Sequence, residues 1–249
     1  MKSISDLPQA FWNEINEITD NKQAIFEESL TMPSPVSIRK NPIKLHDLPT
    51  GRPIPWCKNG FYLSERPVFT LDILFHAGTY YVQEASSMIL EQVFEQILYK
   101  TSESKLILDL CAAPGGKSTH ILSLINENDL LICNEIDKKR ASVLKENIVK
   151  WGRSNVLITN NNVEDFEKYG EMFDVIFVDA PCSGEGMFRK DSFAVEQWSE
   201  SLVNTCSLRQ SQITQTAWQT LKTGGLMIYS TCTYNRKENE HIISQLLEN

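Results

Sequence analysis

Short apolar runs alternate with amphipathic segments along the second part of the chain, from residue 104 onward. The apolar runs lie at residues 106–110, 130–133, 156–159, 173–178 and 226–230. Apolar residues at helical spacing predict helices over residues 116–126, 138–151, 206–222 and 237–247. Strands that alternate with helices predict an α/β fold, in which a parallel sheet carries helices on both faces. Ligands bind such sheets at the carboxyl ends of the strands, so the informative residues should follow the apolar runs.

The first part of the chain has a different pattern. Apolar residues at helical spacing predict two short helices within residues 8–30 and a further helix over residues 83–98. Between them, residues 31–70 are rich in proline, which favours short strands and turns. We therefore expect a small α+β domain over residues 1–78, followed by a larger α/β domain over residues 79–249.

Composition narrows the class of protein. Of the 249 residues, 41% are hydrophobic and 22% are charged, which predicts a packed globule and not a disordered chain. No apolar run reaches the ~18 residues that a membrane span needs. The N-terminus lacks the basic start and apolar core of a secretory signal, so a cytoplasmic protein is expected.

The six cysteines indicate reduced thiols. None forms a CxxC pair, and the four histidines lie apart from them in the sequence. This pattern argues against a zinc site and against a secreted disulfide framework. We expect no bound metal.

The net charge of −8 is unusual for a protein that binds nucleic acid, because phosphate contacts dominate such binding. Basic residues nevertheless gather between positions 39 and 66, namely Arg39, Lys40, Lys44, Arg52, Lys58 and Arg66. This cluster is either a local RNA-binding patch or an ordinary solvated surface, and the sequence leaves both interpretations open.

A glycine-containing turn follows the first apolar run, in the segment CAAPGGKSTH at 111–120. Small residues between a strand and a helix let backbone N–H groups approach a charged ligand, and Lys117 adds a positive charge. The alternative is a plain tight turn. Glu135 follows the second run at a spacing that suits a ribose diol; otherwise it is a solvated acid, with Asp137 capping the next helix.

Two cysteines follow the last two predicted strands. Asp179-Ala-Pro-Cys182 ends the fourth apolar run, and Cys232 comes shortly after the fifth. Adjacent strands would bring both thiols to one edge of the sheet, which predicts thiol chemistry. Two inert buried cysteines or a redox disulfide are the alternatives.

The motifs DLCAAPGGKSTH, DAPCSGEG and YSTCTY, in this order, resemble the Sun (Nol/Nop/Sun) family of RNA cytosine-5 methyltransferases. The resemblance runs over residues 33–240, and SIRKNP and GTYYVQEASSM look like N-terminal motifs of that family. GEGMFRKD and Arg209-Gln210 are similar to bacterial 16S ribosomal-RNA members. The resemblance implies an RNA-binding-type N-terminal domain before a Rossmann-like domain that uses S-adenosylmethionine (SAM). It also implies methylation of ribosomal RNA, with transfer RNA as the alternative.

The resemblance also implies site residues. Those that cradle the methionine part of SAM are Cys111, Ala112, Ala113, Pro114, Gly115, Gly116 and Lys117. Glu135 would hold the ribose, and Asp179 would lie near both the cofactor and the target base. Cys232 would be the nucleophile that adds to cytosine C6, and Cys182 would help to expel the product. Lys190 would line the active site.

Two departures from the family pattern bear on this expectation. Asn162 stands where the family commonly has an aspartate near the adenine; its amide still forms hydrogen bonds, so we expect SAM binding to survive. Sheets of this family also continue past the helix at 237–247 into two further strands. We therefore expect a C-terminally truncated chain, and the alternative function is a fragment that binds SAM or RNA without turnover. A monomer is the default expectation.

Overall fold

The computed structural model describes residues 4–44, 51–98 and 103–248. They form two compact units. The first unit contains residues up to 34, residues 178–219 and residues from 228 onward, and the second contains residues 35–177 and 220–227. Two strands, β8 and β9, run through both units. Each unit is described by itself.

A five-stranded sheet has the order β7-β6-β5-β8-β9. Its strands are β5 (Leu106–Asp109), β6 (Leu130–Asn134), β7 (Val156–Thr159), β8 (Phe173–Asp179) and β9 (Leu221–Ser230). β5 pairs in parallel with β6 and β8, and β6 pairs in parallel with β7. Backbone bonds from Met172 to Thr220 (3.0 Å) and from Ala180 to Ser230 (2.9 Å) show that β8 and β9 run in the same direction. The predicted α/β class with a Rossmann-like parallel sheet is confirmed.

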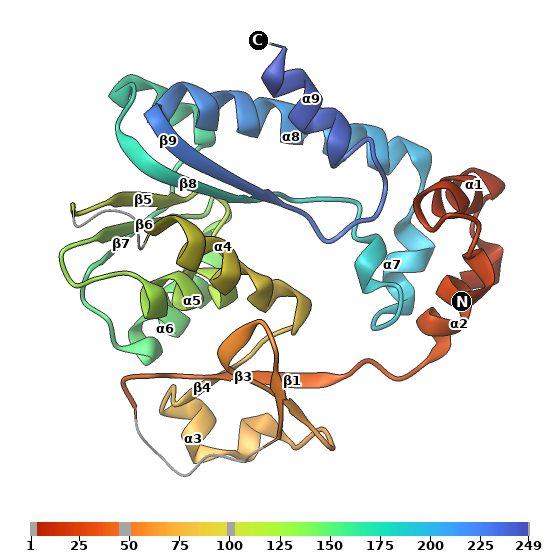
Figure 1. Cartoon of the computed structure of the whole chain (residues 1–249), viewed down its shortest axis with the longest axis horizontal. Coiled ribbons are helices and arrows are strands. Elements are labelled where there is room, and N and C mark those ends of the chain that lie inside the picture. The colour runs from red at the N-terminus through yellow and green to blue at the C-terminus, as the bar shows by residue number, and fades with distance from the viewer. Residues whose placement is uncertain (1–3, 45–50, 99–102, 249) are drawn as a thin grey trace. The chain divides into compact units, whose positions relative to one another are not determined.

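Three helices of the second unit lie on one face of this sheet (Figure 1). They are α4 (Leu90–Leu98), α5 (Gly116–Leu124) and α6 (Lys138–Trp151). α6 begins at Asp137, whose side chain accepts a bond from the Arg140 amide at 2.8 Å, and it ends at Gly152, which has φ +87°. Its side chains Leu144, Ile148 and Trp151 are buried, as the predicted helical stripe required.

A second, antiparallel sheet comes from residues 36–82, with strand order β2-β3-β1-β4. Its strands are β1 (Val36–Lys40), β2 (Arg52–Ile54), β3 (Cys57–Leu63) and β4 (Tyr80–Val82). The short helices of the second unit are η2 (Phe69–Leu71), α3 (Ile73–His76), η3 (Ser86–Ile89) and η4 (Val163–Tyr169). The predicted short strands in the proline-rich segment are confirmed. The domain boundary at residue 78 stays a prediction, and β4 of this sheet lies beyond it.

Arg39 is buried, with 1% of its surface exposed. Its guanidinium donates to Gln83 Oε1 at 2.8 Å and to Thr119 Oγ1 at 2.7 Å. It also lies 4.4 Å from the centre of the Trp151 ring. Placing Arg39 in a basic surface patch was therefore wrong, because its buried guanidinium contacts Thr119 of α5 and Trp151 of α6. Arg52, Lys58 and Arg66 are exposed, so a smaller basic surface remains.

The first unit is largely helical. Its helices are η1 (Ile4–Asp6), α1 (Gln9–Ile18), α2 (Gln23–Thr31), η5 (Glu185–Met187), α7 (Ser192–Gln197), α8 (Glu200–Thr220) and α9 (Glu240–Leu247). Its core is a buried cluster of Leu7, Phe11, Trp12, Ile15, Phe188, Val195, Trp198 and Val203. The two N-terminal helices are confirmed, whereas α7 was not predicted. None of the described helices has the length and apolar character that crossing a bilayer requires.

Candidate functional site

The glycine-containing segment forms a tight turn that opens helix α5. Gly115 precedes the helix with φ +106°, a backbone conformation that favours glycine. A Cβ atom added to Gly116 would lie only 3.2 Å from Cε1 of Tyr81. The close approach of Tyr81 to the backbone therefore favours glycine at this position as well. Ala112 donates its amide to the Asn134 carbonyl at 2.8 Å, which fixes the turn against the end of β6.

Polar side chains of α6 hold the carbonyl groups of this turn. Arg140 Nη2 donates to the Ala113 carbonyl at 2.8 Å, and Asn147 Nδ2 donates to the Pro114 carbonyl at 2.8 Å. Cys111 and Lys117 are half-buried at its two ends. With its carbonyl groups occupied, the turn is rigid and can present N–H groups to a ligand.

Asp109 is a buried residue of the site that sequence reasoning missed. It ends β5, is 1% exposed, and accepts a bond from Ser118 Oγ at 2.6 Å. It therefore ties the strand to the first turn of α5. An acidic residue inside the apolar run at 106–110 was the signal that could have found it.

Glu135 is buried at the end of β6, with 2% of its surface exposed. Its Oε1 accepts from the Asp137 amide at 3.0 Å, and its Oε2 lies 3.1 Å from Arg140 Nη1. The solvated-acid interpretation of Glu135 is wrong, although Asp137 does cap α6 as that interpretation expected. Asn162 is exposed and caps η4 in a reciprocal pair with Asp165, so it has a structural role here.

The two predicted thiols meet in the first unit. Cys182 Sγ lies 3.1 Å from Cys232 Sγ, and the Cys232 amide donates to Cys182 Sγ at 3.2 Å. The predicted proximity of the two cysteines is confirmed. Cys232 is exposed and Cys182 is half-buried, and both are free thiols, so the interpretation of two inert buried cysteines is wrong.

The two sulfur atoms have different surroundings. The hydrogen bond with Cys232, and then burial, raise the pKa of the Cys182 thiol well above its ordinary value. Cys182 is therefore a neutral thiol near pH 7. Asp179, at the end of β8, accepts a bond from Ser230 Oγ at 2.8 Å and is half-buried. Lys190 is exposed, beyond the turn that follows Cys182.

Another cysteine, Cys57, lies in a buried polar cluster of the second unit. Cys57 Sγ lies 3.8 Å from Nε2 of His120, which in turn lies 3.2 Å from Glu91 Oε2. Sequence separation had placed the histidines apart from the cysteines, and for His120 that inference was wrong, because α4 packs against α5 and the Lys58 amide of β3 donates to Glu91 of α4 at 3.0 Å. Burial raises the pKa of Cys57 to about 12, so this thiol is not a nucleophile near neutral pH.

We expect this cluster to make the fold sensitive to acid. Burial, and then the charge of Arg39, lower the pKa of His120 to about 4. A histidine that must stay neutral in the folded state stabilises the fold less as pH falls from about 6.5 towards 4, because the unfolded chain takes up the proton first. At pH 5 the expected loss is on the order of 2 kcal/mol relative to pH 7. Urea denaturation at both pH values measures it, and His120→Gln should remove most of this difference; an equal difference in both proteins would contradict the assignment.

Solved structures share this fold. A methyltransferase homologue from Pyrococcus horikoshii is 25% identical, with a TM-score of 0.78 over 98% of this chain and 79% of its own. NSun6 from Pyrococcus horikoshii, solved with SFG, is 19% identical and has a TM-score of 0.82 over 97% of this chain and 87% of its own, which shows the fold alone. The described fold is therefore the Rossmann-like α/β fold of these methyltransferase structures.

The family profile described as 16S rRNA methyltransferase RsmB/F matches residues 96–249, and the profile for the N-terminal domain of 16S rRNA methyltransferase RsmF matches residues 7–85. The chain belongs to the 16S rRNA methyltransferase RsmB/F family. The resemblance inferred from the motifs is thereby confirmed.

Curated relatives carry the name ribosomal RNA small subunit methyltransferase F. The protein from Shewanella loihica is 38% identical over 197 residues, which cover 78% of this chain and 40% of that protein. The protein from Psychromonas ingrahamii is 36% identical over 258 residues, which cover 97% of this chain and 53% of that protein. The chain thus spans about half the length of the curated relatives that it matches.

Proposed function

We propose that this chain methylates C5 of a cytosine in small-subunit ribosomal RNA, with SAM as methyl donor and Cys232 as covalent nucleophile. The contact between Cys182 and Cys232 at 3.1 Å carries the proposal. Two accessible thiols in contact suit a covalent mechanism. Methylation of an exocyclic amine, in contrast, needs no nucleophilic thiol. The names of the curated relatives support ribosomal RNA as substrate.

The residues of the second unit fit SAM. The turn at Gly115 and Gly116 leaves out side chains that a Cβ would bring against Leu144 and Tyr81, and its carbonyl groups are already bonded to α6. The amino-acid part of SAM would contact the segment 111–117, and the buried Glu135 would accept bonds from the ribose. Asn162, bonded within its own helix cap, would contribute less near the adenine. When bound, SAM supplies an electrophilic methyl group.

Cys232 begins the chemistry as a thiolate. Its sulfur forms a bond to C6 of the cytosine, and the electron pair of the C5–C6 double bond moves onto C5, which takes the methyl group. A base then removes the C5 proton, the C5–C6 double bond returns, and the S–C6 bond breaks. Cys182, held as a neutral thiol beside Cys232, can pass its proton to the departing sulfur. The target base must be unstacked for this attack.

Asp179 and Lys190 would act on the base. The carboxyl group of Asp179, at the end of β8, would accept a bond from the exocyclic amine of cytosine. In its protonated form it would donate to N3, where negative charge develops. Its bond from Ser230 Oγ fixes one oxygen of Asp179 and orients the other. The exposed ammonium of Lys190 suits the RNA backbone or the active-site rim.

The test is product identity. The chain, labelled SAM and 16S ribosomal RNA from cells that lack this modification are incubated, and the RNA is digested to nucleosides. We expect label in 5-methylcytidine, and none when SAM is omitted. Label in N4-methylcytidine would contradict attack by C5, and label confined to transfer RNA in a mixed RNA pool would contradict the substrate.

A further inference from the structure

Two loops carry the thiols of the first unit, and they touch each other through their backbones as well. Residues 181–186 follow β8 and contain Cys182, and residues 231–238 follow β9 and contain Cys232. The Gly186 amide donates to the Cys232 carbonyl at 2.8 Å, and Ser183 Oγ lies 3.0 Å from Thr233 Oγ1. Neither loop is a β-strand, so the distance between the two sulfur atoms is not fixed by pairing within the sheet. Side-chain contacts between the loops must help to fix it.

A buried carboxylate joins the first loop to the second. Glu185 is 1% exposed. Its Oε2 accepts the backbone amides of Tyr234 (2.8 Å) and Asn235 (3.1 Å), two and three residues after Cys232. Its Oε1 accepts from Trp198 Nε1 and from Asn235 Nδ2, each at 3.0 Å. One side chain thus holds the backbone of the opposite loop.

A second buried carboxylate makes the same connection in the reverse direction. Glu238 belongs to the Cys232 loop and is 0% exposed. Its Oε2 accepts from the Ser183 amide at 2.9 Å, one residue after Cys182, and from Gln210 Nε2 at 2.8 Å. Its Oε1 accepts from Asn235 Nδ2 at 2.7 Å. Gln210 also donates to the Pro181 carbonyl at 3.0 Å, on the other side of Cys182.

We propose that Glu185 and Glu238 are positioning residues, which hold the two cysteine loops in the register that brings Cys182 against Cys232. Each carboxylate is bonded to neutral N–H groups of the loop that does not contain it, and Asn235 Nδ2 bridges the two. A buried carboxylate forms strong, directional bonds to N–H donors, and the network leaves the thiols themselves untouched. This proposal rests on the proposed function for its catalytic meaning, because the thiol pair matters only if it reacts.

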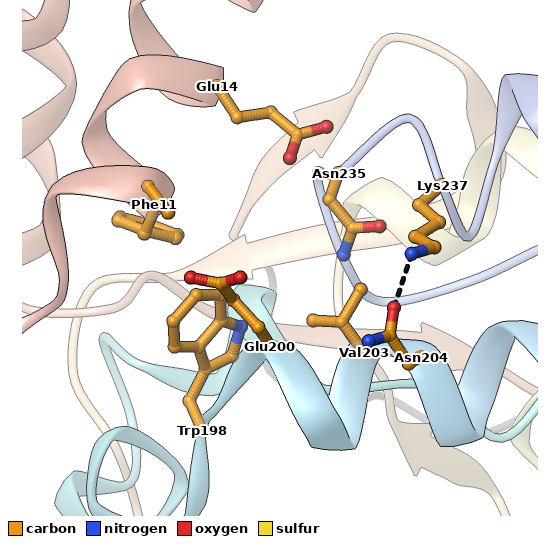
Figure 2. A pocket seen from close by; sticks show the side chains of 9 residues that line it. Phe11, Glu14, Trp198, Glu200, Val203, Asn204, Asn235 and Lys237 are labelled. Carbon is orange, nitrogen blue, oxygen red and sulfur yellow. Dashed lines mark hydrogen bonds between the residues drawn. The ribbon is translucent and has the colours of Figure 1, made fainter.

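Glu200, which lines a small pocket next to the network, provides a matched control substitution. The pocket has a volume of about 170 Å³, and its lining includes Trp198 and Asn235 of the network and the exposed Glu200. Figure 2 shows the side chains of Glu200, Trp198 and Asn235 among those that line this pocket. Glu200→Gln therefore changes a carboxylate to an amide next to the network, in the first turn of α8, without removing a bond that joins the loops.

The experiment measures the effective concentration of one thiol at the other, through equilibrium with reduced and oxidised glutathione, in the full chain without SAM or RNA. Mass spectrometry of peptides separates the Cys182–Cys232 disulfide from those of other cysteines. Glu185→Gln and Glu238→Gln each place an amide NH₂ against an N–H donor, and we expect the effective concentration to fall at least about tenfold. Gln210→Met removes the bonds to Glu238 and to the Pro181 carbonyl but leaves both carboxylates in place, so we expect a fall of about threefold. Glu200→Gln should stay within twofold of wild type.

The proposal would be overturned if Glu185→Gln and Glu238→Gln, each unfolding cooperatively, had effective thiol concentrations within twofold of that of Glu200→Gln. If Glu185→Gln and Glu238→Gln do not fold, Gln210→Met decides by the same comparison with Glu200→Gln. With RNA and SAM, the folded variants should lose kcat and keep the KM for RNA within about twofold. Because the glutathione equilibrium needs no methyl transfer, its result stands even if wild type transfers no methyl group, and that failure would count against the proposed function alone.

Discussion

Replacing Cys232 by alanine is expected to lower methyl transfer by roughly four orders of magnitude or more, because no other group then activates C5 of the base. Cys182→Ala is expected to retain the attack on C6 and to accumulate a covalent protein–RNA adduct, since the thiol beside the departing sulfur is gone. Denaturing gels of each variant with labelled RNA and SAM measure both effects: an adduct with Cys182→Ala and none with Cys232→Ala.

Cys206→Ala is the matched control. Cys206 is a cysteine of the same unit, but it is buried in α8 and burial raises the pKa of its thiol, so it should be chemically silent. Full methyl transfer by Cys232→Ala would contradict the assigned nucleophile. The reverse pattern, with an adduct only in Cys232→Ala, would exchange the roles of the two thiols.

Truncating Arg39 is expected to destabilise the fold by about 3–5 kcal/mol, because buried acceptors lose their donor and the removed side chain leaves a cavity. Arg39→Ala leaves Gln83 Oε1 without its donor, removes the bond to Thr119, and opens space beside Trp151. Urea denaturation of the full chain measures the change in free energy of unfolding.

Arg52→Ala is the matched control for this change. Arg52 also lies over an aromatic ring, at 4.9 Å from the centre of Tyr62, but it is exposed. Its loss should cost less than about 1 kcal/mol. A cost that small for Arg39→Ala would mean that its bonds to the helix contribute little, and that the join between β1 and α5 rests on apolar packing instead.

Much of the fold was readable from the sequence because its periodicities are local. The apolar runs predicted five strands, and the stripe of Leu144, Ile148 and Trp151 predicted α6 with its C-terminus at residue 151. Helix α7 was missed because six residues, with Val195 the buried one, are too few to show a helical period. Helix α8 begins six residues before its predicted start, since polar residues line its first turns.

Site residues could be predicted from the sequence where they belong to a short motif. They could not be predicted where their hydrogen-bond partners are distant in the sequence. The cysteines at two strand ends predicted their own contact. Burial of Arg39 was not predictable, because Thr119 and Ser123, which lie near its guanidinium, are about eighty residues away. Glu185 stood in a sequence motif without an assigned role and Glu238 stood outside the motifs, and the bonds of both to the opposite loop depend on the three-dimensional arrangement. The proposed roles of the SAM-contacting residues remain predictions.

The first helices of the chain also reach the loop that carries Cys232. The Arg236 amide donates to Glu14 Oε1 at 2.7 Å across 222 residues of sequence, and Arg189 Nε donates to the Met32 carbonyl at 2.9 Å. Closing so long a loop costs conformational entropy, which the contacts between residues 4–34 and the loop at residues 231–238 must offset. The thiol region therefore reaches its described arrangement only after residue 236 has been synthesised. A substitution in residues 4–34 therefore acts on the segment that carries Cys232, although more than two hundred residues separate the two in the sequence.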